Sequence, residues 1–486
     1  MEHKRLLIAT ILFVIFLVFW QMFFFKQPPT QPQQAGQKEQ VDSSNAELQA
    51  SGIPEIDTIS QNPIIVKTPL YTAKFSANGV LLDYYIPKYD VHLLPEGGFA
   101  FSTPFDSLFE RPPIETLYVS DVDFSLEFIG ITPDSAETLV KSFKFKPESY
   151  LIEFKGPNIL SFSSLNFTEQ NLKDELRYTG LISYRTKYQK LSVKKIRPKF
   201  QLDGEELIWA GFRTKYFMMA VIPLENTQID DIYITETDKN KFKLDFVFKS
   251  PNPEMQVYFG PIDYYRLKEV GYALWRVFDF GPAIVRPFGK IILSIIRFLY
   301  RYIHNYGWVI VIFAVLMKFV LFPVNLKNLK NMQKMRELKP QLDAIKKRFK
   351  DDPERMQREM MELYRKHGFN PFSGCLILLF QLPIFWAMYQ ILRTYIDLRG
   401  AHWILWIKDL SSRDPYFILP ILMGITSLAQ SLMQPMQDEQ SKIMAIMMPL
   451  IFTFIFLTFP SGIVLYWLTF NLLGVAEQIV LRRWKQ

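Results

Sequence analysis

Residues 306–325 read YGWVIVIFAVLMKFVLFPVN, and this stretch decides the fold. Twenty residues with a single charge are long enough, as an α-helix, to cross about 30 Å of hydrocarbon. Four further apolar segments follow near residues 372–393, 416–433, 443–459 and 461–481. Several contain Pro, Gly or Gln, which membrane helices tolerate where neighbouring helices satisfy the freed polar groups. The sequence therefore predicts a core of five membrane-spanning helices over residues 306–486.

A sixth apolar segment lies at the N-terminus, where residues 6–25 read LLIATILFVIFLVFWQMFFF. A cleaved signal peptide is the alternative, but the apolar run is long for one and no small-x-small cleavage site follows it. The basic flank MEHKR favours a cytoplasmic N-terminus. We therefore expect an uncleaved anchor over residues 1–26, six spans in all, and both termini in the cytoplasm.

The segment between the anchor and the core is composed differently. Residues 27–60 are rich in Pro, Gln and Ser, which predicts a flexible linker. Residues 61–262 predict an all-β sandwich, because residues 120–128 alternate between apolar and polar, with Val122, Phe124, Leu126 and Phe128 on one face. Asn78-Gly79 between two apolar runs predicts a tight hairpin, since both residue types tolerate positive φ.

Charge and cysteine content limit the function. The 486 residues carry a net charge of +8, which by itself suggests a nucleic-acid partner. Residues 27–262 are acidic overall, however, and residues 326–371 are densely basic. Basic residues next to membrane spans stay in the cytoplasm, so we expect residues 27–262 outside, in the periplasm, and the basic loop inside. A single cysteine excludes an intrachain disulfide and any multi-cysteine metal site.

Residues 263–305 are expected to connect the outer domain to the core through an amphipathic helix. In residues 288–305, Lys290, Ser294, Arg297 and Arg301 recur every three or four positions, with isoleucines between them. This pattern is typical of a helix in the membrane interface. A helix packed on the outer domain is the alternative.

The basic loop, residues 326–371, predicts a hairpin of two helices. Apolar residues recur at helical spacing on both sides of Asp351-Asp352-Pro353: Met335, Leu338, Leu342, Ile345 and Phe349 before it, and Met356, Met360 and Leu363 after it. We expect Asp352 to cap the second helix, Pro353 to begin it and Gly368 to end it. Pro340 predicts a kink or a start in the first helix.

Basic residues gather around the turn of this hairpin. They are Lys346, Lys347, Arg348, Arg355 and Arg358. They fit a solvated face that keeps the loop in the cytoplasm, and equally a docking arm for the ribosome or for lipid headgroups. Charge alone leaves both interpretations open.

Lys318 lies in the middle of the 306–325 segment. A charge near the centre of a membrane helix costs about 2.5–3.5 kcal/mol on insertion scales. The acidic residues Asp397 and Glu477 lie near the ends of their segments, so the sequence predicts no ion pair at the depth of Lys318. A water-filled groove or snorkelling of the side chain to an interface would then accommodate the charge.

Other polar residues occupy the remaining apolar segments. They are Gln381, Gln390, Thr426, Gln430, Gln434, Asn471 and Gln478. Such groups often hydrogen-bond between helices, which is a structural role. Gathered around Lys318, they would instead line a polar groove.

Catalysis has little support in the sequence. The histidines are scattered, and Cys375 lies in an apolar segment, where packing is its usual role. HExxH, Walker A and serine-nucleophile motifs are absent from the sequence. We therefore expect a protein that is not an enzyme and needs no cofactor, metal or small-molecule substrate.

Three motifs in the core resemble those of a known family. They are NPFSGCLILLFQLPIFWAMYQ at 370–390, WIKDLSSRDPYFILPILMG at 406–424 and FPSGIVLYWLTFNLL at 459–473. In this order, with the hairpin before the first, they resemble the YidC membrane-protein insertases. The anchor and outer domain resemble the Gram-negative type, which resides in the bacterial inner membrane.

The resemblance implies a hydrophilic groove open to the cytoplasm and lipid, and nascent membrane proteins, the ribosome and the Sec translocon as partners. It implies that Gln430 and Trp467 line the groove. It also implies that Lys318 takes a position where bacterial members usually carry Arg, which keeps the charge but loses the bidentate fork.

These observations lead to one hypothesis and two alternatives. In the hypothesis, a client's polar segment enters the groove and is held by Lys318 while its apolar segment moves into lipid. One alternative is a transporter or channel for a small anion bound at Lys318, although the core shows no internal repeat. In the other alternative, the outer domain is a ligand-binding or enzymatic module that is only anchored to the membrane by the helices.

Overall fold

The computed structural model describes residues 62–132, 137–169, 171–196, 199–368, 373–434 and 439–483. The anchor predicted over residues 1–26 and the linker predicted over 27–60 lie outside the described residues. The chain divides into two compact units. Within the described residues, one unit holds residues 324–376, and the other holds the β domain, residues up to 323 and residues from 377 onward.

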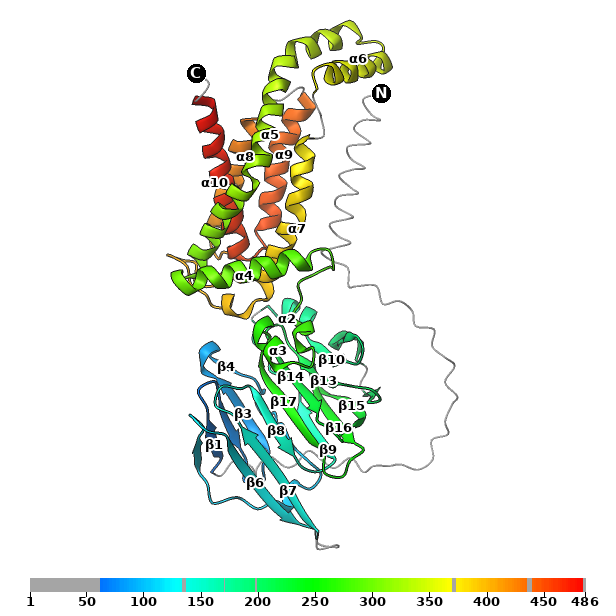
Figure 1. The fold of residues 1–486 in the computed structure, drawn as a ribbon, viewed down its shortest axis with the longest axis vertical. Helices are drawn as coiled ribbons and strands as arrows, with labels where there is room; N and C mark the ends of the chain where they lie inside the picture. Colours follow the sequence, from blue (N-terminus) through cyan, green and yellow to red (C-terminus); the bar gives the residue numbers. More distant parts are fainter. Residues whose placement is uncertain are drawn as a thin grey trace, which may run out of the picture. The chain divides into compact units, whose positions relative to one another are not determined.

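The β domain contains three sheets (Figure 1). The first has the order β4-β3-β2-β1-β5, with β1 Ile64–Lys67, β2 Thr72–Phe75, β3 Leu81–Ile86, β4 Val91–His92 and β5 Thr116–Tyr118. The second has the order β11-β10-β13-β14-β17-β8-β7-β6, with β6 Phe124–Ile131, β7 Thr138–Phe145, β8 Leu151–Lys155, β10 Gly180–Tyr184, β11 Tyr188–Ser192, β13 Trp209–Arg213, β14 Phe217–Pro223 and β17 Glu254–Pro261. The third has the order β12-β15-β16-β9, with β9 Ile159–Ser163, β12 Lys199–Asp203, β15 Ile229–Asp238 and β16 Lys241–Phe248. Strand pairs among the described residues are antiparallel except β1 with β5.

Aromatic side chains hold the sheets together in two layers. Phe75 of the first sheet packs edge-on against Phe143 of the second, with ring centroids 5.0 Å apart. Phe101 lies where the sheets meet and contacts both Phe143 and Phe162, the latter from the third sheet. Isolated bridges on either side of Phe101 link the first sheet to the third. The second sheet therefore covers the other two, as in a β-sandwich.

Two predictions about strands meet different outcomes. The hairpin at Asn78-Gly79 is confirmed, because β2 and β3 pair across it, although only Gly79 takes positive φ, at 78°. The prediction that the apolar residues of 120–128 form one buried strand face is wrong for the first half of that stretch. Leu126 and Phe128 are fully buried, but Val122 is 72% exposed and precedes the strand, which begins at Phe124.

The helices follow the predicted segments closely. They are α2 Leu172–Tyr178, α3 Tyr264–Val270, α4 Arg286–Ile303, α5 Tyr306–Arg348, α6 Pro353–Lys366, α7 Ser373–Thr394, α8 Ile418–Leu432, α9 Glu439–Phe456 and α10 Ser461–Arg483. Short 3-10 turns are η2 Pro87–Tyr89, η3 Asp106–Leu108, η4 Val193–Lys195, η5 Leu274–Val277 and η6 Ile396–Leu398. Tyr306–Leu326 and Ser461–Val480 are long and apolar enough to cross a membrane, and α8 and α9 contain shorter apolar stretches.

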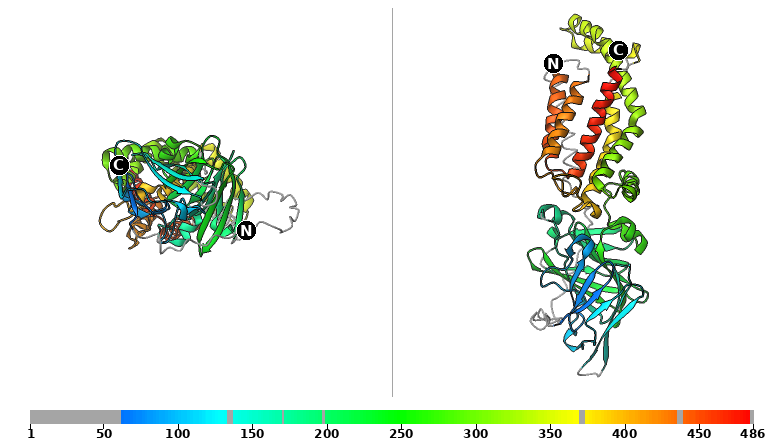
Figure 2. Two further views of the ribbon diagram at one scale, coloured as in Figure 1. Left: turned by 90° about the horizontal axis from the view of Figure 1, so that it is seen from below. Right: turned by 90° about the vertical axis from the view of Figure 1, so that its left-hand side faces the viewer.

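Helix α10 lies beside α8, and α8 lies beside α9 (Figure 2). Helix α7 joins this group through Phe385, which contacts Phe456 of α9 and Trp467 of α10. Helix α5 joins through Phe313, whose ring lies 6.0 Å from that of Tyr466 on α10. Helix α10 therefore contacts α5, α7 and α8.

The hairpin unit confirms the predicted turn and corrects its first helix. The Asp352 side chain accepts a hydrogen bond from the Arg355 backbone N–H, Pro353 begins α6, and Gly368 follows it with φ of 59°. Helix α5 does not start at Pro340; it runs without a break from Tyr306 to Arg348. One helix thus contains both the first core segment and the first arm of the hairpin.

The apolar seam of the hairpin forms the expected small core. Met335, Leu338 and Leu342 of α5 are buried, and Met360 and Leu363 of α6 pack against them. Tyr364, which the periodic pattern did not include, is buried with them at 7% exposure.

Helix α4 is amphipathic, as predicted, with its polar face turned to the β domain. The Ser294 hydroxyl lies 2.6 Å from that of Tyr265, and the Arg297 guanidinium stacks 4.0 Å from the centre of the Tyr265 ring. The packed-helix interpretation thus describes the polar contacts with Tyr265. The apolar residues are divided, because Ile292, Leu293 and Ile296 are buried while Ile291 and Phe298 are exposed.

The two-layer core predicts a large effect at Phe101. We expect Phe101→Ala to destabilise the β domain by about 3–5 kcal/mol, because it removes a buried ring that touches both layers. Phe105→Ala is the control, since Phe105 is 36% exposed, and should cost less than about 1 kcal/mol. Urea titration of the full chain in detergent, followed by pulse proteolysis of the β domain, measures both. Equal midpoints for the two variants would contradict the role of Phe101.

Candidate functional site

Lys318 forms an ion pair inside the helical core. Its Nζ lies 2.8 Å from Oε2 of Glu477 on α10, and the two side chains are only 13% and 12% exposed. The Nζ also lies 4.9 Å from the centre of the Phe470 ring. The prediction of no ion pair at this depth is therefore wrong. The position of Glu477 near the end of its segment did not exclude the pair, because the long side chains of Lys318 and Glu477 reach each other between the two helices.

The other polar candidates meet α10 at separate places. Gln381 of α7 donates from Nε2 to the Tyr466 hydroxyl at 3.3 Å. Asn471 of α10 is buried and donates from Nδ2 to Ser427 Oγ at 2.5 Å. Gln430 of α8 lies so close to α10 that any side chain at Gly474 would collide with its amide.

The remaining two candidates differ, because Thr426 bonds within its own helix and Trp467 packs among aromatic rings of other helices. The Thr426 hydroxyl donates to the Leu422 and Met423 carbonyls of its own helix, each at 2.9 Å. Trp467 packs against Phe385 and Phe456. Of the six candidates, the structure thus brings Lys318 to Glu477, places Gln381, Gln430 and Asn471 against or on α10, puts Trp467 in an aromatic cluster and leaves Thr426 bonded within α8.

Several buried polar atoms in this core have no hydrogen-bond partner among the described residues. They are Oε1 of Gln381, Oε1 of Glu477 and Oε1 of Gln478. Buried polar groups are normally hydrogen-bonded, because an unpaired one costs about 1–3 kcal/mol. The interior of the helical group can therefore accept hydrogen bonds from water or from a polar chain.

The surface of the helical group is apolar. On α9, Ile443 is 59% and Phe454 is 73% exposed, and on α5 Phe319 is 72% exposed. Apolar surface of this extent belongs in lipid rather than in water. The helices thus combine an apolar exterior with polar groups inside.

The basic residues of the hairpin lie on its surface. Lys347, Arg348, Arg355 and Arg358 are exposed, and Lys346 is half-buried. Arg348 and Arg355 both lie near Phe349, with guanidinium carbons 5.4 and 5.1 Å from the ring centre. The turn therefore carries a basic patch that is held in part by an aromatic ring.

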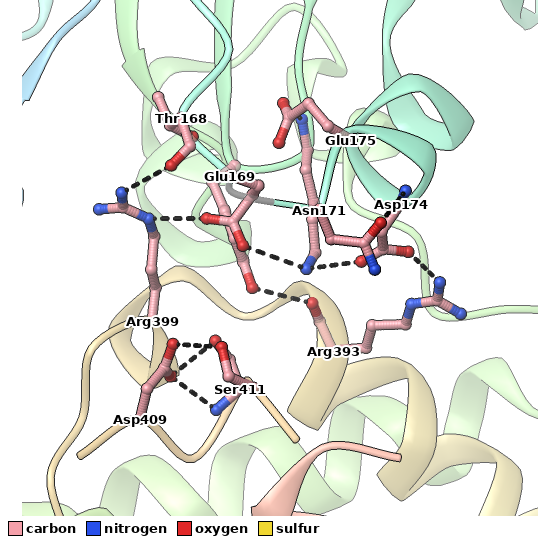
Figure 3. Close-up of polar contacts among 12 residues, drawn as sticks. Thr168, Glu169, Asn171, Asp174, Glu175, Arg393, Arg399, Asp409 and Ser411 are labelled. Atoms are coloured by element: carbon pink, nitrogen blue, oxygen red, sulfur yellow. Dashed lines mark hydrogen bonds and ion pairs between the residues drawn. The ribbon is translucent and has the colours of Figure 1, made fainter. Parts of the chain in front are cut away.

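A network of charges joins the β domain to the segment that follows α7 (Figure 3). Arg393, in the last turn of α7, forms an ion pair with Asp174 of α2. Arg399 donates from Nε to Glu169 Oε1 at 2.9 Å, and Lys215 Nζ lies 2.9 Å from Asp174 Oδ2. We call these five residues the joint.

A second ion pair lies beside the joint. Lys88 Nζ lies 2.7 Å from Asp397 Oδ1, and the hydroxyls of Tyr89 and Tyr395 donate to the same carboxylate at 3.0 and 2.9 Å. Burial alone would raise the pKa of Asp397, but Lys88 and these hydroxyls outweigh it and hold the pKa below its usual value. In the same way, Arg393 and Lys215 outweigh burial and lower the pKa of Asp174.

Sequence analysis missed the joint and the partner of Lys318. The joint residues are distant in the chain, and each charge by itself is typical of a loop or helix end. The signal in the sequence that could have indicated this partner is Glu477 itself, an acidic residue in an otherwise apolar segment. Among the described residues, no group of three or more His, Cys, Asp or Glu side chains could hold a metal ion.

The structure combines helices that have an apolar exterior and an internal ion pair with a β-rich domain that salt bridges join to them. These features define an α-helical membrane protein with a large extramembrane domain. Residues 298–486 match the family described as "60Kd inner membrane protein", and residues 131–293 match the one described as "YidC periplasmic domain". The chain therefore belongs to the YidC family of membrane protein insertases.

Full-length relatives support this membership. The chain is 32% identical to "Membrane protein insertase YidC" of Geotalea daltonii over 99% of both chains. It is 30% identical to the protein of the same description from Syntrophus aciditrophicus, over 99% of both, and from Campylobacter jejuni, over 99% of this chain and 96% of that one.

The membership confirms the predicted family and function. The protein is a membrane protein insertase of the inner membrane, with nascent membrane proteins as its clients and without enzymatic activity. It combines a helical insertase core with a β-rich periplasmic domain. The alternatives of an anion transporter and an anchored enzymatic module are therefore not needed.

The joint predicts a pH dependence that comes from Glu175. This side chain is fully buried next to the joint, where Oε1 accepts a hydrogen bond from the Lys215 backbone N–H at 3.0 Å. Burial raises the pKa of its carboxyl from 4.5 to about 7, with the nearby Glu169 and Asp174 adding to the effect and the Lys215 contacts opposing it. The folded chain thus keeps this proton to higher pH than the unfolded chain does.

Stability should therefore fall as pH rises from about 4.5 to about 7 and level off above that, with a total loss of about 3 kcal/mol from this group. Glu175→Gln should remove this part of the slope. Glu205→Gln, at an exposed position, is the control and should keep it. Pulse proteolysis of the full chain in detergent between pH 5 and 8 measures the profiles. Parallel slopes for wild type and Glu175→Gln would contradict the assignment.

Proposed function

We propose that the chain inserts its clients through a hydrophilic groove in which Lys318 is the charged contact. The proposed lining consists of Lys318, Gln381, Thr426, Gln430, Trp467 and Asn471. A client's polar, often acidic, segment enters this groove and is held transiently. Its apolar segment moves into lipid, so that no nucleotide or catalytic group is required.

The observation that carries the proposal is a charge kept inside a membrane-spanning helix. A lysine at this depth is costly unless it is paired or hydrated, and Lys318 is only 13% exposed. The Oε1 atoms of Gln381 and Gln478, which have no partner within the described part of the chain, lie in the same group of helices. Such groups provide hydrogen-bonding capacity where lipid provides none, which shortens the path of a polar segment through hydrocarbon.

Release into lipid follows from the apolar exterior. The proposed exit lies past α7 and α9, and the exposed side chains of Ile443 and Phe454 on α9 support it. Transfer of the client's apolar segment into lipid gains about 0.8 kcal/mol per CH₂. The membrane potential adds about 2.3 kcal/mol per charge per 100 mV, with a sign set by the charge that moves.

The proposed topology has six spans with both termini in the cytoplasm. The domains are an anchor over 1–26, a linker over 27–60, a periplasmic β-sandwich over 61–262, an interfacial segment over 263–305 and an insertase core over 306–486 that includes the hairpin 326–371. The apolar exposed face of α4, with Ile291 and Phe298, supports contact with lipid at the outer interface.

The proposed partners beyond clients are the ribosome, the Sec translocon and membrane lipids. The exposed basic patch of the hairpin supports the ribosome, because RNA phosphates and dense Lys/Arg surfaces attract one another strongly at low salt.

Lys318 variants test the groove with clients that carry an acidic tail. Lys318→Arg should insert them normally, since it retains the charge, whereas Lys318→Ala should reduce insertion at least about tenfold. Insertion into proteoliposomes, scored by protease protection of the tail, is the measurement. Lys408→Ala, on the loop before α8, is the control and should behave as wild type. Normal insertion of acidic-tailed clients by Lys318→Ala would refute the electrostatic contact.

Charge reversal tests the hairpin. Arg355→Glu with Arg358→Glu should weaken binding of ribosomes by at least about tenfold at low salt and flatten its salt dependence. Arg365→Glu with Lys366→Glu, exposed at the far end of the same helix, is the matched control. Ribosome co-sedimentation with full-chain proteoliposomes gives the affinities. Equal loss in both double variants would indicate general charge repulsion and not a docking patch.

A further inference from the structure

The ion pair between Lys318 and Glu477 has a consequence for client selection. At 2.8 Å the two charges cancel, so the groove at rest presents no net charge at this point. An acidic client therefore encounters a Lys318 side chain that is already paired with the carboxylate of Glu477. Contact with Lys318 requires an exchange of one carboxylate for another.

Energetics allow such an exchange. An unpaired buried charge is strongly unfavourable, and a resident carboxylate removes that penalty while the groove is empty. A client carboxylate that takes the place of Glu477 restores the pair, so the net change is the difference between two similar contacts. Binding through exchange is therefore weak and reversible, which suits a client that must leave.

The displaced side chain also has room to rearrange. Glu477 uses Oε2 for Lys318, and its buried Oε1 has no hydrogen-bond partner among the described residues. Arg483, the last residue of α10, is six positions on, or about 9 Å along the helix. Glu477 is thus close enough to the helix end for its carboxylate to turn toward solvent.

We propose that Glu477 is the resident counter-ion of the groove and a specificity-determining residue for clients. A carboxylate-bearing polar segment displaces it from Lys318, and an uncharged segment leaves the pair closed. This inference rests on the proposed function of Lys318 as a client contact.

The first test compares two clients that differ only in charge. One carries two Asp residues and a photoreactive residue in its polar tail, and the other has Asn in place of each Asp. Full-length wild type, Glu477→Gln and Glu477→Asp are reconstituted in proteoliposomes, and crosslinks from tail to insertase are quantified. Glu477→Asp keeps the carboxylate and should resemble wild type.

Glu477→Gln should raise the crosslink yield of the acidic client relative to the Asn client by about fivefold, because the competing carboxylate is gone. It should also slow release of the acidic client. An unchanged ratio between the two clients would overturn the inference, as would an equal rise or fall for both, which is the expectation for a purely structural pair.

A second test uses the client without acidic residues and the double variant. Lys318→Ala leaves Glu477 unpaired and should impair insertion even of this client, and Lys318→Ala with Glu477→Gln should restore it. Failure of the double variant to restore insertion, in protein that elutes as wild type on size exclusion, would overturn the inference.

The outcomes separate the inference from the proposed function. If Lys318→Ala inserts acidic clients normally, the proposed contact fails and the inference fails with it. If Lys318→Ala is defective for acidic clients but Glu477→Gln does not alter the ratio between clients, only the counter-ion role fails.

Discussion

A charge removed from water must find an opposite charge, and this constraint determines three parts of the structure. In the β domain, the fully buried Lys141 is paired with Asp106. At the joint, Arg393 is paired with Asp174. In the helical core, Lys318 is paired with Glu477. Because an isolated buried charge costs several kcal/mol, removal of either partner of such a pair penalises the arrangement of the elements that carry it.

Helix α10 carries both a member of the buried ion pair and residues of the proposed groove. Tyr466, Phe470 and Glu477 follow one another at spacings of four and seven residues, which are one and two helical turns, and face α5 and α7. Asn471 and Gly474 face α8. One helix therefore holds the others through polar contacts on two faces. The same groups that hold the helices together are the ones available to a polar client, so packing and function share residues.

The joint gives the β domain a defined connection to the core. Arg393, in the last turn of α7, reaches Asp174 in α2, and Arg399, in the segment after α7, reaches Glu169 just before α2 (Figure 3). Salt bridges of this kind are directional and depend on charge. The β domain is thus attached through side chains distant in sequence from the polypeptide connection through α4.

Periodicity, composition and capping residues by themselves determined the helical core segments, the turn of the hairpin with Asp352 and Pro353, and the β-rich domain, and the resemblance of three core motifs indicated the family. These features are local, because apolar spacing, caps and motifs act over a few residues. Only the tertiary structure decided the partner of Lys318, the unbroken course of α5 and the joint. The ion pair and the joint depend on contacts between elements far apart in the chain, which no local pattern reports. Helix α5 continues through Pro340, where proline by itself predicts a kink or a start.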